Sequence, residues 1–160
     1  MKYFAYGSNL NHKQMAERCP DSKFLKRVFL ENYRFIFDGY STRWDGAPEN
    51  IEPSVSDMVW GGLYEISEKD LANLDKCENC NSAESKKGIC SKCGEDLYAR
   101  KEMEFKDDDG KETKALVYFR MGLKEGEPSE KYLNTVVQGA HDCGLPEDYI
   151  SFLAGEKLEV

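Results

Sequence analysis

Apolar and polar residues alternate in several short stretches of the chain, which is typical of half-buried β-strands. Residues 2–6 are aromatic and end at a glycine, so they predict a first strand that runs into a tight loop. The alternation at the end of residues 24–37 predicts a second strand, and residues 58–66 predict the clearest strand of all. Within this last stretch, the pair Gly61-Gly62 indicates a bulge or a close approach of another backbone.

A β-hairpin is predicted later in the chain. Residues 97–105 and the run 115–119 flank the polar turn Asp107-Asp108-Asp109-Gly110-Lys111. The pattern is weaker at residues 51–55, because Pro53 cannot donate a hydrogen bond to a neighbouring strand. We therefore expect only a short or edge strand there.

Four stretches show helix-start signals followed by an apolar face. Asn9 or Asn11 can cap the first helix, and Ser67 with Asp70 forms an Asp version of the capping box at the second. The four predicted helices run up to about Cys19, from Ser67 to about Asp75 or Lys76, from Ser129 to about Asp142, and from about Glu147 to Leu153.

The length and charge of the chain limit its class of function. A chain of 160 residues fits one domain, residues 1–160, with room for a small insertion. Its 22 Lys and Arg against 30 Asp and Glu give a net charge of −8, whereas a protein that neutralises phosphates needs a basic stripe. No apolar run reaches the length of a signal peptide or a membrane span. We expect a cytoplasmic protein that binds neither nucleic acid nor a membrane.

Four of the six cysteines form two C-x-x-C pairs with nine residues between them: Cys77, Cys80, Cys90 and Cys93. Two thiolates three residues apart bind a cation from one side, and a second such pair completes a tetrahedron. Without a secretory signal, metal binding is favoured over disulfides and over free thiols. The spacing predicts a structural zinc ion (Zn²⁺), with iron as the alternative metal, in a short zinc-ribbon-like loop at residues 77–94.

Two further features indicate a reaction site. The turn Gly7-Ser8-Asn9 lies between a predicted strand and a predicted helix, where backbone N–H groups suit an anion such as a substrate carboxylate, although an ordinary turn is the alternative. Glu78 lies just past the C-terminal end of the second predicted helix, where the helix dipole disfavours an ionised carboxylate and raises its pKa. A solvated loop carboxylate is the alternative there.

Five short motifs occur in order across nearly the whole chain. They are Tyr3-Phe4-Ala5-Tyr6-Gly7-Ser8-Asn9-Leu10, Val59-Trp60-Gly61, Leu74-Asp75-x-x-Glu78, Pro128-Ser129-x-x-Tyr132 and Gly139-Ala140-x-x-x-Gly144-Leu145-Pro146-x-x-Tyr149. Each motif alone is weak, but together they are specific. With them the chain resembles the gamma-glutamylcyclotransferase family.

The resemblance implies an α+β fold, a small closed mixed β-barrel with helices packed outside it. It implies that Glu78 is the general acid/base and that the loop Tyr6-Gly7-Ser8-Asn9 holds the glutamyl end of the substrate. Tyr132 would line the site, with Tyr118 as a less certain neighbour. The implied partner is a small-molecule gamma-glutamyl substrate, and no organic cofactor or oligomeric state is implied.

The implied reaction is an intramolecular cyclisation. The α-amine of a γ-glutamyl group attacks its own γ-amide carbonyl, closes 5-oxoproline and releases an amine or amino acid. The sequence departs from the family at Asn79, where the family has glycine, and in the cysteine-rich insertion. Two other functions stay open: a γ-glutamylamine cyclotransferase, and a non-catalytic barrel that binds a ligand or protein through the zinc loop.

Overall fold

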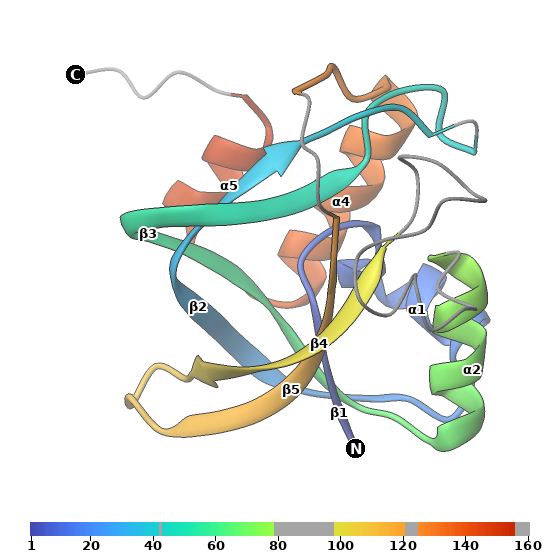
Figure 1. Ribbon diagram of the computed structural model, residues 1–160, viewed down its shortest axis with the longest axis vertical. Coiled ribbons are helices and arrows are strands. Elements are labelled where there is room, and N and C mark those ends of the chain that lie inside the picture. Colours follow the sequence, from blue (N-terminus) through green and yellow to red (C-terminus); the bar gives the residue numbers. More distant parts are fainter. Residues whose placement is uncertain (42, 79–97, 121–124, 156–160) are drawn as a thin grey trace.

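The computed structural model describes residues 1–41, 43–78, 98–120 and 125–155 (Figure 1). Its strands form a closed barrel in the order β1-β3-β2-β4-β5. Strands β1 and β5 run parallel, through the pair Tyr3 and Leu116, and the other neighbouring strands are antiparallel. The strands are β1 Lys2–Ala5, β2 Lys23–Phe37, β3 Glu49–Glu65, β4 Ala99–Lys106 and β5 Glu112–Phe119. The predicted fold class, a closed mixed barrel with flanking helices, is confirmed.

A short or edge strand is expected at Pro53; the short length is wrong, because β3 runs without a break through this residue, whereas the edge position is right. Pro53 pairs with Tyr33 of β2, next to a register shift between Glu31 and Tyr33 that accommodates an irregular ladder. In the described residues β1 pairs with β3 only at Gly62–Glu65, so around Pro53 the ladder partner is β2 alone. The proline is tolerated because this part of a long strand has an open edge.

The glycine pair in β3 marks the close backbone approach that the sequence predicts. A Cβ on Gly61 would lie 2.2 Å from the carbonyl oxygen of Ala5 in β1. This contact is part of the β1–β3 ladder, in which Ala5 pairs with Gly62. Because Gly61 has no side chain, β1 can lie close enough to β3 to pair with it in the barrel.

Replacing Gly61 by alanine is expected to lower the free energy of unfolding by about 3 kcal/mol, because a backbone oxygen cannot move aside without distorting the ladder. Gly62→Ala is the control, since its new methyl group would meet the Cys143 side chain first, at 2.9 Å. Denaturant unfolding measures both variants. Equal losses in the two would contradict this account of Gly61.

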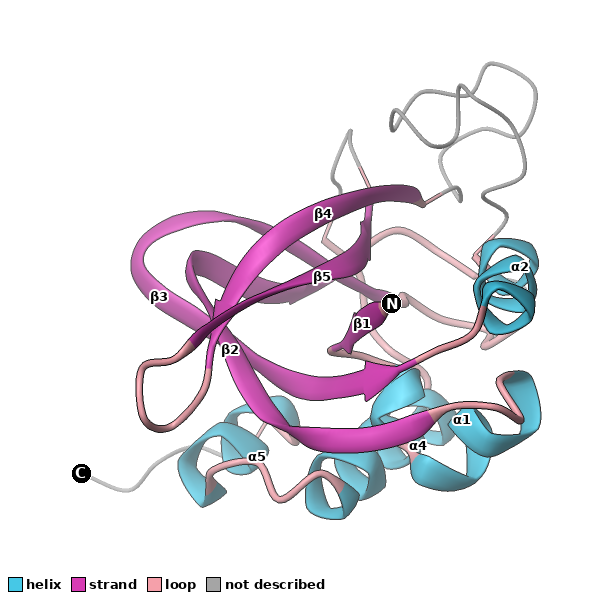
Figure 2. Cartoon of the chain, turned by 90° about the horizontal axis from the view of Figure 1, so that it is seen from below, coloured by secondary structure: helices cyan, strands magenta, loops and turns pink. Residues whose placement is uncertain are grey.

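The helices cover one side and one end of the barrel. In Figure 2, α1, α4 and α5 lie in a row along the same side, and α2 lies apart from them. The longest described helix, α4, has 13 residues, and no described helix is long and apolar enough to cross a membrane. The helical elements are η1 Ser8–Leu10, α1 His12–Arg18, α2 Glu68–Cys77, α4 Glu130–Asp142 and α5 Glu147–Leu153.

Local signals place the ends of these helices. Asn11 caps α1 by accepting a hydrogen bond from the Gln14 N–H group, and Ser67 and Asp70 form both bonds of the capping box of α2. Helix α4 packs directly on the chain before α1, because a Cβ on Gly139 would lie 2.2 Å from the Asn11 nitrogen. This contact fixes the loop after β1 against the outside of the barrel.

Candidate active site

A cavity of about 170 Å³ lies at the end of the barrel where β1, β2 and β5 finish and β3 and β4 begin. It brings together Ser8 of the first loop, Glu49 at the start of β3 and Glu78 at the end of α2. The aromatic residues Tyr40, Trp44 and Tyr98 and three arginines also line it; the arginines are Arg18, Arg43 and Arg120. Two carboxylates and several cations thus face a small enclosed space.

Glu78 is the C-cap of α2 and is almost fully buried, with 7% of its surface exposed. Its N–H group donates to the Leu74 carbonyl oxygen at 2.9 Å, and its own carbonyl oxygen accepts from the Tyr98 N–H group at 3.3 Å. Burial raises the pKa of Glu78 to about 8, and the nearby Glu49 charge adds to this shift, against the opposing effect of three arginines. The direction agrees with the sequence-based expectation, but burial is the main cause.

Glu49 is a second carboxylate at this site, and the sequence reasoning missed it. Its Oε2 atom accepts a hydrogen bond from the Tyr132 hydroxyl, and its N–H group donates to the same hydroxyl oxygen at 2.8 Å. Burial raises the pKa of Glu49, and the hydrogen bond from Tyr132 offsets part of the rise. No local signal in the polar stretch before residue 50 distinguishes this glutamate from the other acidic residues.

The predicted loop Tyr6-Gly7-Ser8-Asn9 lies at the cavity, but its side chains are largely engaged with the protein. The Asn9 amide donates to the Tyr3 hydroxyl at 3.0 Å, and its oxygen accepts from Arg18 at 3.0 Å. The Ser8 hydroxyl accepts from Gln14 at 2.7 Å, and the Tyr6 hydroxyl donates to the Tyr118 carbonyl oxygen. Of these four residues, only Ser8 is among the residues that line the cavity.

The two tyrosines suggested by the resemblance have different surroundings. The Tyr132 hydroxyl reaches Glu49, so this tyrosine orients a residue of the cavity. The Tyr118 hydroxyl instead donates to Asp75 at 2.6 Å, and Asp75 also pairs with Arg100. Tyr118 is therefore engaged outside the lining of the cavity.

Comparison with known proteins agrees with this geometry. Residues 58–153 match the AIG2-like family. The chain belongs to the AIG2-like family. Its relatives include the gamma-glutamylcyclotransferases of Mus musculus and Homo sapiens, each 28% identical over 151 residues that cover 92% of this chain and 73% of the relative.

Solved structures share the whole fold of this AIG2-like chain. A structure of a gamma-glutamyl cyclotransferase superposes with a TM-score of 0.84 at 26% identity, covering 99% of this chain and 89% of the other. A crystal structure of an uncharacterized Homo sapiens protein gives the same TM-score at 27% identity, covering 99% and 88%. The family resemblance read from the five motifs is confirmed.

Of the four cysteines predicted to bind zinc, only Cys77 falls within the described part of this AIG2-like chain. It is the last residue of α2, its side chain is partly exposed, and it forms no disulfide. Cys80, Cys90 and Cys93 lie outside the described residues, as does Asn79. Within the described ranges, no group of three or more His, Cys, Asp and Glu residues could hold a metal ion.

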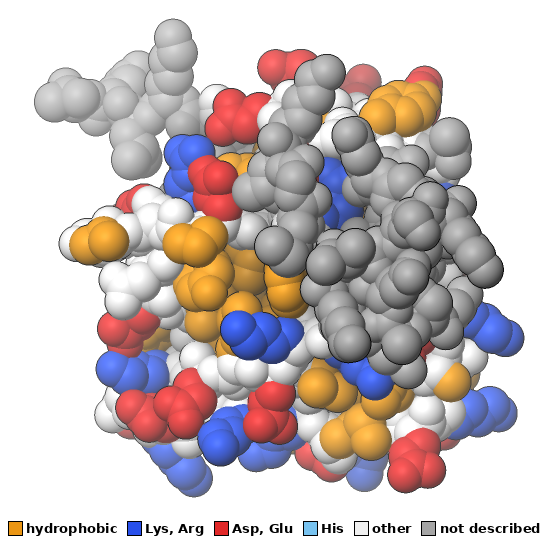
Figure 3. All heavy atoms as spheres, viewed as in Figure 1, with side chains coloured by type: hydrophobic (Ala, Val, Ile, Leu, Met, Phe, Trp, Pro, Cys, Tyr) orange, Lys and Arg blue, Asp and Glu red, His pale blue; other side chains and the backbone are white. Residues whose placement is uncertain are grey.

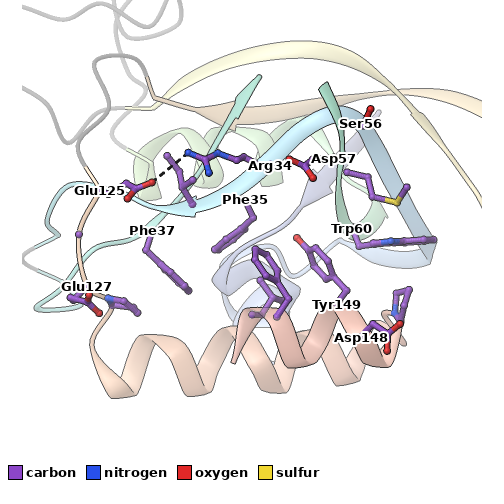
Figure 4. Close-up of a pocket in the computed structure, with 17 residues that line it drawn as sticks. Arg34, Phe35, Phe37, Ser56, Asp57, Trp60, Glu125, Glu127, Asp148 and Tyr149 are labelled. Atoms are coloured by element: carbon purple, nitrogen blue, oxygen red, sulfur yellow. Dashed lines mark hydrogen bonds and ion pairs between the residues drawn. The ribbon is translucent and has the colours of Figure 1, made fainter. Parts of the chain in front are cut away.

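A larger groove of about 900 Å³ lies elsewhere on this AIG2-like barrel, between β2, β3 and α5. Figure 4 shows Phe35, Trp60 and Tyr149 on its walls and the ion pair of Arg34 with Glu125 near its edge. None of the predicted site residues lines it. Ser8 and Glu78, two of the predicted site residues, line the smaller cavity instead.

Acidic and basic side chains are interspersed over the described part of the face seen in Figure 3. This face carries no extended basic stripe of the kind that binds a phosphate backbone. The concentration of arginines inside the small cavity is a local feature and suits a small anionic group.

Proposed function

We propose that this chain is a gamma-glutamylcyclotransferase, an enzyme that converts a γ-glutamyl amide into 5-oxoproline and a free amine or amino acid. The observation that carries the proposal is the buried carboxyl group of Glu78 in a cavity shared with the loop after β1. The relatives that match over most of the chain, and a structure with a TM-score of 0.84, bear the name gamma-glutamylcyclotransferase.

The proposed reaction is internal to the substrate. The α-amine nitrogen attacks the γ-carbonyl carbon, a new C–N bond closes the five-membered ring, and the bond from that carbon to the leaving nitrogen breaks. Because nucleophile and electrophile belong to one molecule, holding the substrate in a folded conformation supplies much of the acceleration. No water is consumed.

Glu78 is proposed to serve the proton transfers between the two reacting nitrogens. It accepts a proton from the α-ammonium group, which frees the attacking lone pair, and delivers a proton to the nitrogen of the leaving amine. The second proton that the α-nitrogen loses as the ring closes ends on the released amine, which leaves as an ammonium ion. A carboxyl group with a pKa of about 8 has both its ionised and its protonated form accessible near neutral pH, so it can act first as a base and then as an acid. The backbone of the loop Tyr6-Gly7-Ser8-Asn9 is proposed to hold the glutamyl end.

A panel of γ-glutamyl compounds tests this proposal. Glutathione, γ-glutamyl dipeptides and γ-glutamylamines are incubated with wild-type protein and with Glu78→Gln, and released 5-oxoproline is measured. We expect release from at least one class with wild type and almost none with the variant. Release from γ-glutamylamines alone would assign the γ-glutamylamine cyclotransferase activity. If no compound releases 5-oxoproline and the chain binds a protein partner instead, the enzyme hypothesis fails and the non-catalytic binding barrel takes its place.

We also propose that Cys77, Cys80, Cys90 and Cys93 hold a structural zinc ion. The support is their spacing, together with the partly exposed, unoxidised side chain of Cys77 at the end of α2. A closed set of four thiolates leaves no open position, so the ion would stabilise the chain after α2 and take no part in proton transfer. Glu78 follows Cys77 directly, so the same ion would help to fix it.

Metal analysis tests the zinc proposal. We expect about one zinc ion per chain in wild type and almost none in the double variant Cys90→Ser and Cys93→Ser, because a tetrahedral site loses two ligands. Cys143→Ala is the control, since this buried thiol lies in the core beside Tyr64 and should leave the zinc content unchanged. Wild-type protein without zinc or iron, or full zinc in the double variant, would contradict the proposal.

A further inference from the structure

Glu49 lies directly against the loop that is proposed to hold the glutamyl group. A Cβ on Gly7 would lie 2.4 Å from Cγ and Cδ of Glu49 and 2.6 Å from its Oε1 atom. The carboxylate therefore rests on the backbone of Gly7, at the wall of the same cavity that contains Glu78. A side chain at residue 7 would displace it.

The position of Glu49 is fixed at both its side chain and its backbone. Tyr132 binds Oε2 through its hydroxyl, and burial raises the pKa of Tyr132 well above its usual value, so this hydroxyl stays a donor. Tyr98 donates its hydroxyl to the Glu49 carbonyl oxygen at 2.5 Å. With Oε2 held by Tyr132, Oε1 rests against Gly7 at the cavity wall. An ordered carboxylate loses little conformational entropy when a ligand binds to it.

The cavity carries positive charge as well as Glu49. Arg18 and Arg43 also line it, and the charge of Arg18 acts on both Glu49 and Glu78. Among the described residues neither arginine forms a side-chain ion pair, and Glu49 forms none either. One guanidinium nitrogen of Arg18 donates a hydrogen bond to the Asn9 amide oxygen. Complementary charges thus face one small space without neutralising each other in a direct salt bridge.

The geometry points to a clamp for a zwitterion, in which Glu49 binds the α-ammonium group of the γ-glutamyl substrate and Arg18 binds its α-carboxylate. This assignment rests on the proposed function and names how that site recognises its substrate. The Glu49 carboxylate would repel a simple anion, and the arginines would repel a simple amine. Only a head group that carries both charges is attracted to both sides of the cavity. Because the α-nitrogen is also the attacking atom, Glu49 determines where that atom lies before it loses its proton.

Binding of two simple ligands tests the clamp without any turnover. L-glutamate carries the α-ammonium group, and glutarate is the same molecule without it. We expect wild-type protein to bind L-glutamate more tightly than glutarate by calorimetry, and Glu49→Gln to reduce this preference by about 10- to 100-fold, the range of one charge-assisted hydrogen bond. Arg18→Met should weaken the binding of both ligands and leave the preference for L-glutamate over glutarate nearly unchanged. Glu127→Gln, at an exposed residue outside the cavity, is the matched control and should change nothing.

A second variant keeps the test decisive if Glu49→Gln does not fold. Tyr132→Phe retains the Glu49 charge and removes the hydroxyl that orients it, so it should reduce the preference by a smaller factor. An unchanged preference in whichever of the two variants is folded, or wild type that shows no preference or no binding of L-glutamate at millimolar concentration, overturns the clamp. Failure of the proposed function is seen separately, as absence of 5-oxoproline from every γ-glutamyl compound.

Discussion

Glu78→Gln is expected to lower kcat for 5-oxoproline release by about 10²- to 10⁴-fold, the range that one general acid/base contributes. Glutamine keeps the size and hydrogen-bonding ability of the side chain but cannot accept the α-ammonium proton. KM should change little, because Glu49 and Arg18 are proposed to carry the binding. A steady-state comparison of the two proteins measures both constants. A variant with more than about a tenth of wild-type kcat would mean that another group moves the proton.

The pH dependence of kcat/KM in the wild-type protein should report the ionisation of Glu78. Glu78 works as a base in its ionised form, and its pKa is about 8, so kcat/KM should fall as the pH decreases below that value. Because Glu49 interacts with Glu78, the observed value belongs to the pair. A limb near the usual carboxylate pKa, close to pH 4, would contradict the burial of Glu78 at the active site.

Stability provides the control for this variant. The folded-state pKa of Glu78 is raised, so between about pH 4.5 and pH 8 the folded protein binds a proton that the unfolded chain has lost. The stability contributed by this proton is fully present below the unfolded pKa and is lost as the pH rises through the folded pKa. Glu78→Gln has no such dependence, so its stability relative to wild type should increase from pH 5 to pH 8, by up to about 1.4 kcal/mol per pH unit.

Arg120→Met is expected to lower the free energy of unfolding by about 3 to 5 kcal/mol, because it removes the guanidinium group that pairs with the buried Asp38 carboxylate. Arg120 and Asp38 are exposed by only 3% and 1%, and Asn50 bonds to both. This network joins the end of β2, the start of β3 and the end of β5 behind the cavity. Chemical denaturation at constant pH measures the loss.

A double variant separates the buried charge from the packing. Arg120→Met together with Asp38→Leu removes both charges, so it should be less destabilised than the sum of the two single variants. Additive losses of unfolding free energy in the double variant, or a loss below about 1 kcal/mol in Arg120→Met, would show that the Asp38–Arg120 pair does not stabilise this end of the barrel.

Much of the fold follows from short-range signals in the sequence. The caps at Asn11 and Ser67 and the alternation in β2 depend on residues a few positions apart, so they could be read directly. Glu78 was also predictable, since the motif and the end of α2 place it without reference to distant residues. Pro53 indicated the open edge of β3 but not the length of this strand, because the length depends on the pairing with β2, which is a tertiary property.

The electrostatic part of the site could not be predicted in this way. Glu49 acquires its role from Tyr132, which lies 83 residues later, and the Asp38–Arg120 pair joins residues 82 positions apart. A charged residue in a polar stretch is normally solvated, whereas in the closed barrel Asp38 and Arg120 are buried and Glu49 is half-buried. The clamp and the network are therefore results of the three-dimensional arrangement.

Product analysis in ¹⁸O-labelled water tests the central claim most directly. The γ-glutamyl compound that is turned over in the substrate panel is incubated with wild-type protein in this water, and the products are analysed by mass spectrometry. Attack by the substrate's own α-amine predicts 5-oxoproline without ¹⁸O, together with the free amine or amino acid. Glutamate that contains ¹⁸O would show attack by water and would contradict the cyclotransferase account of Glu78.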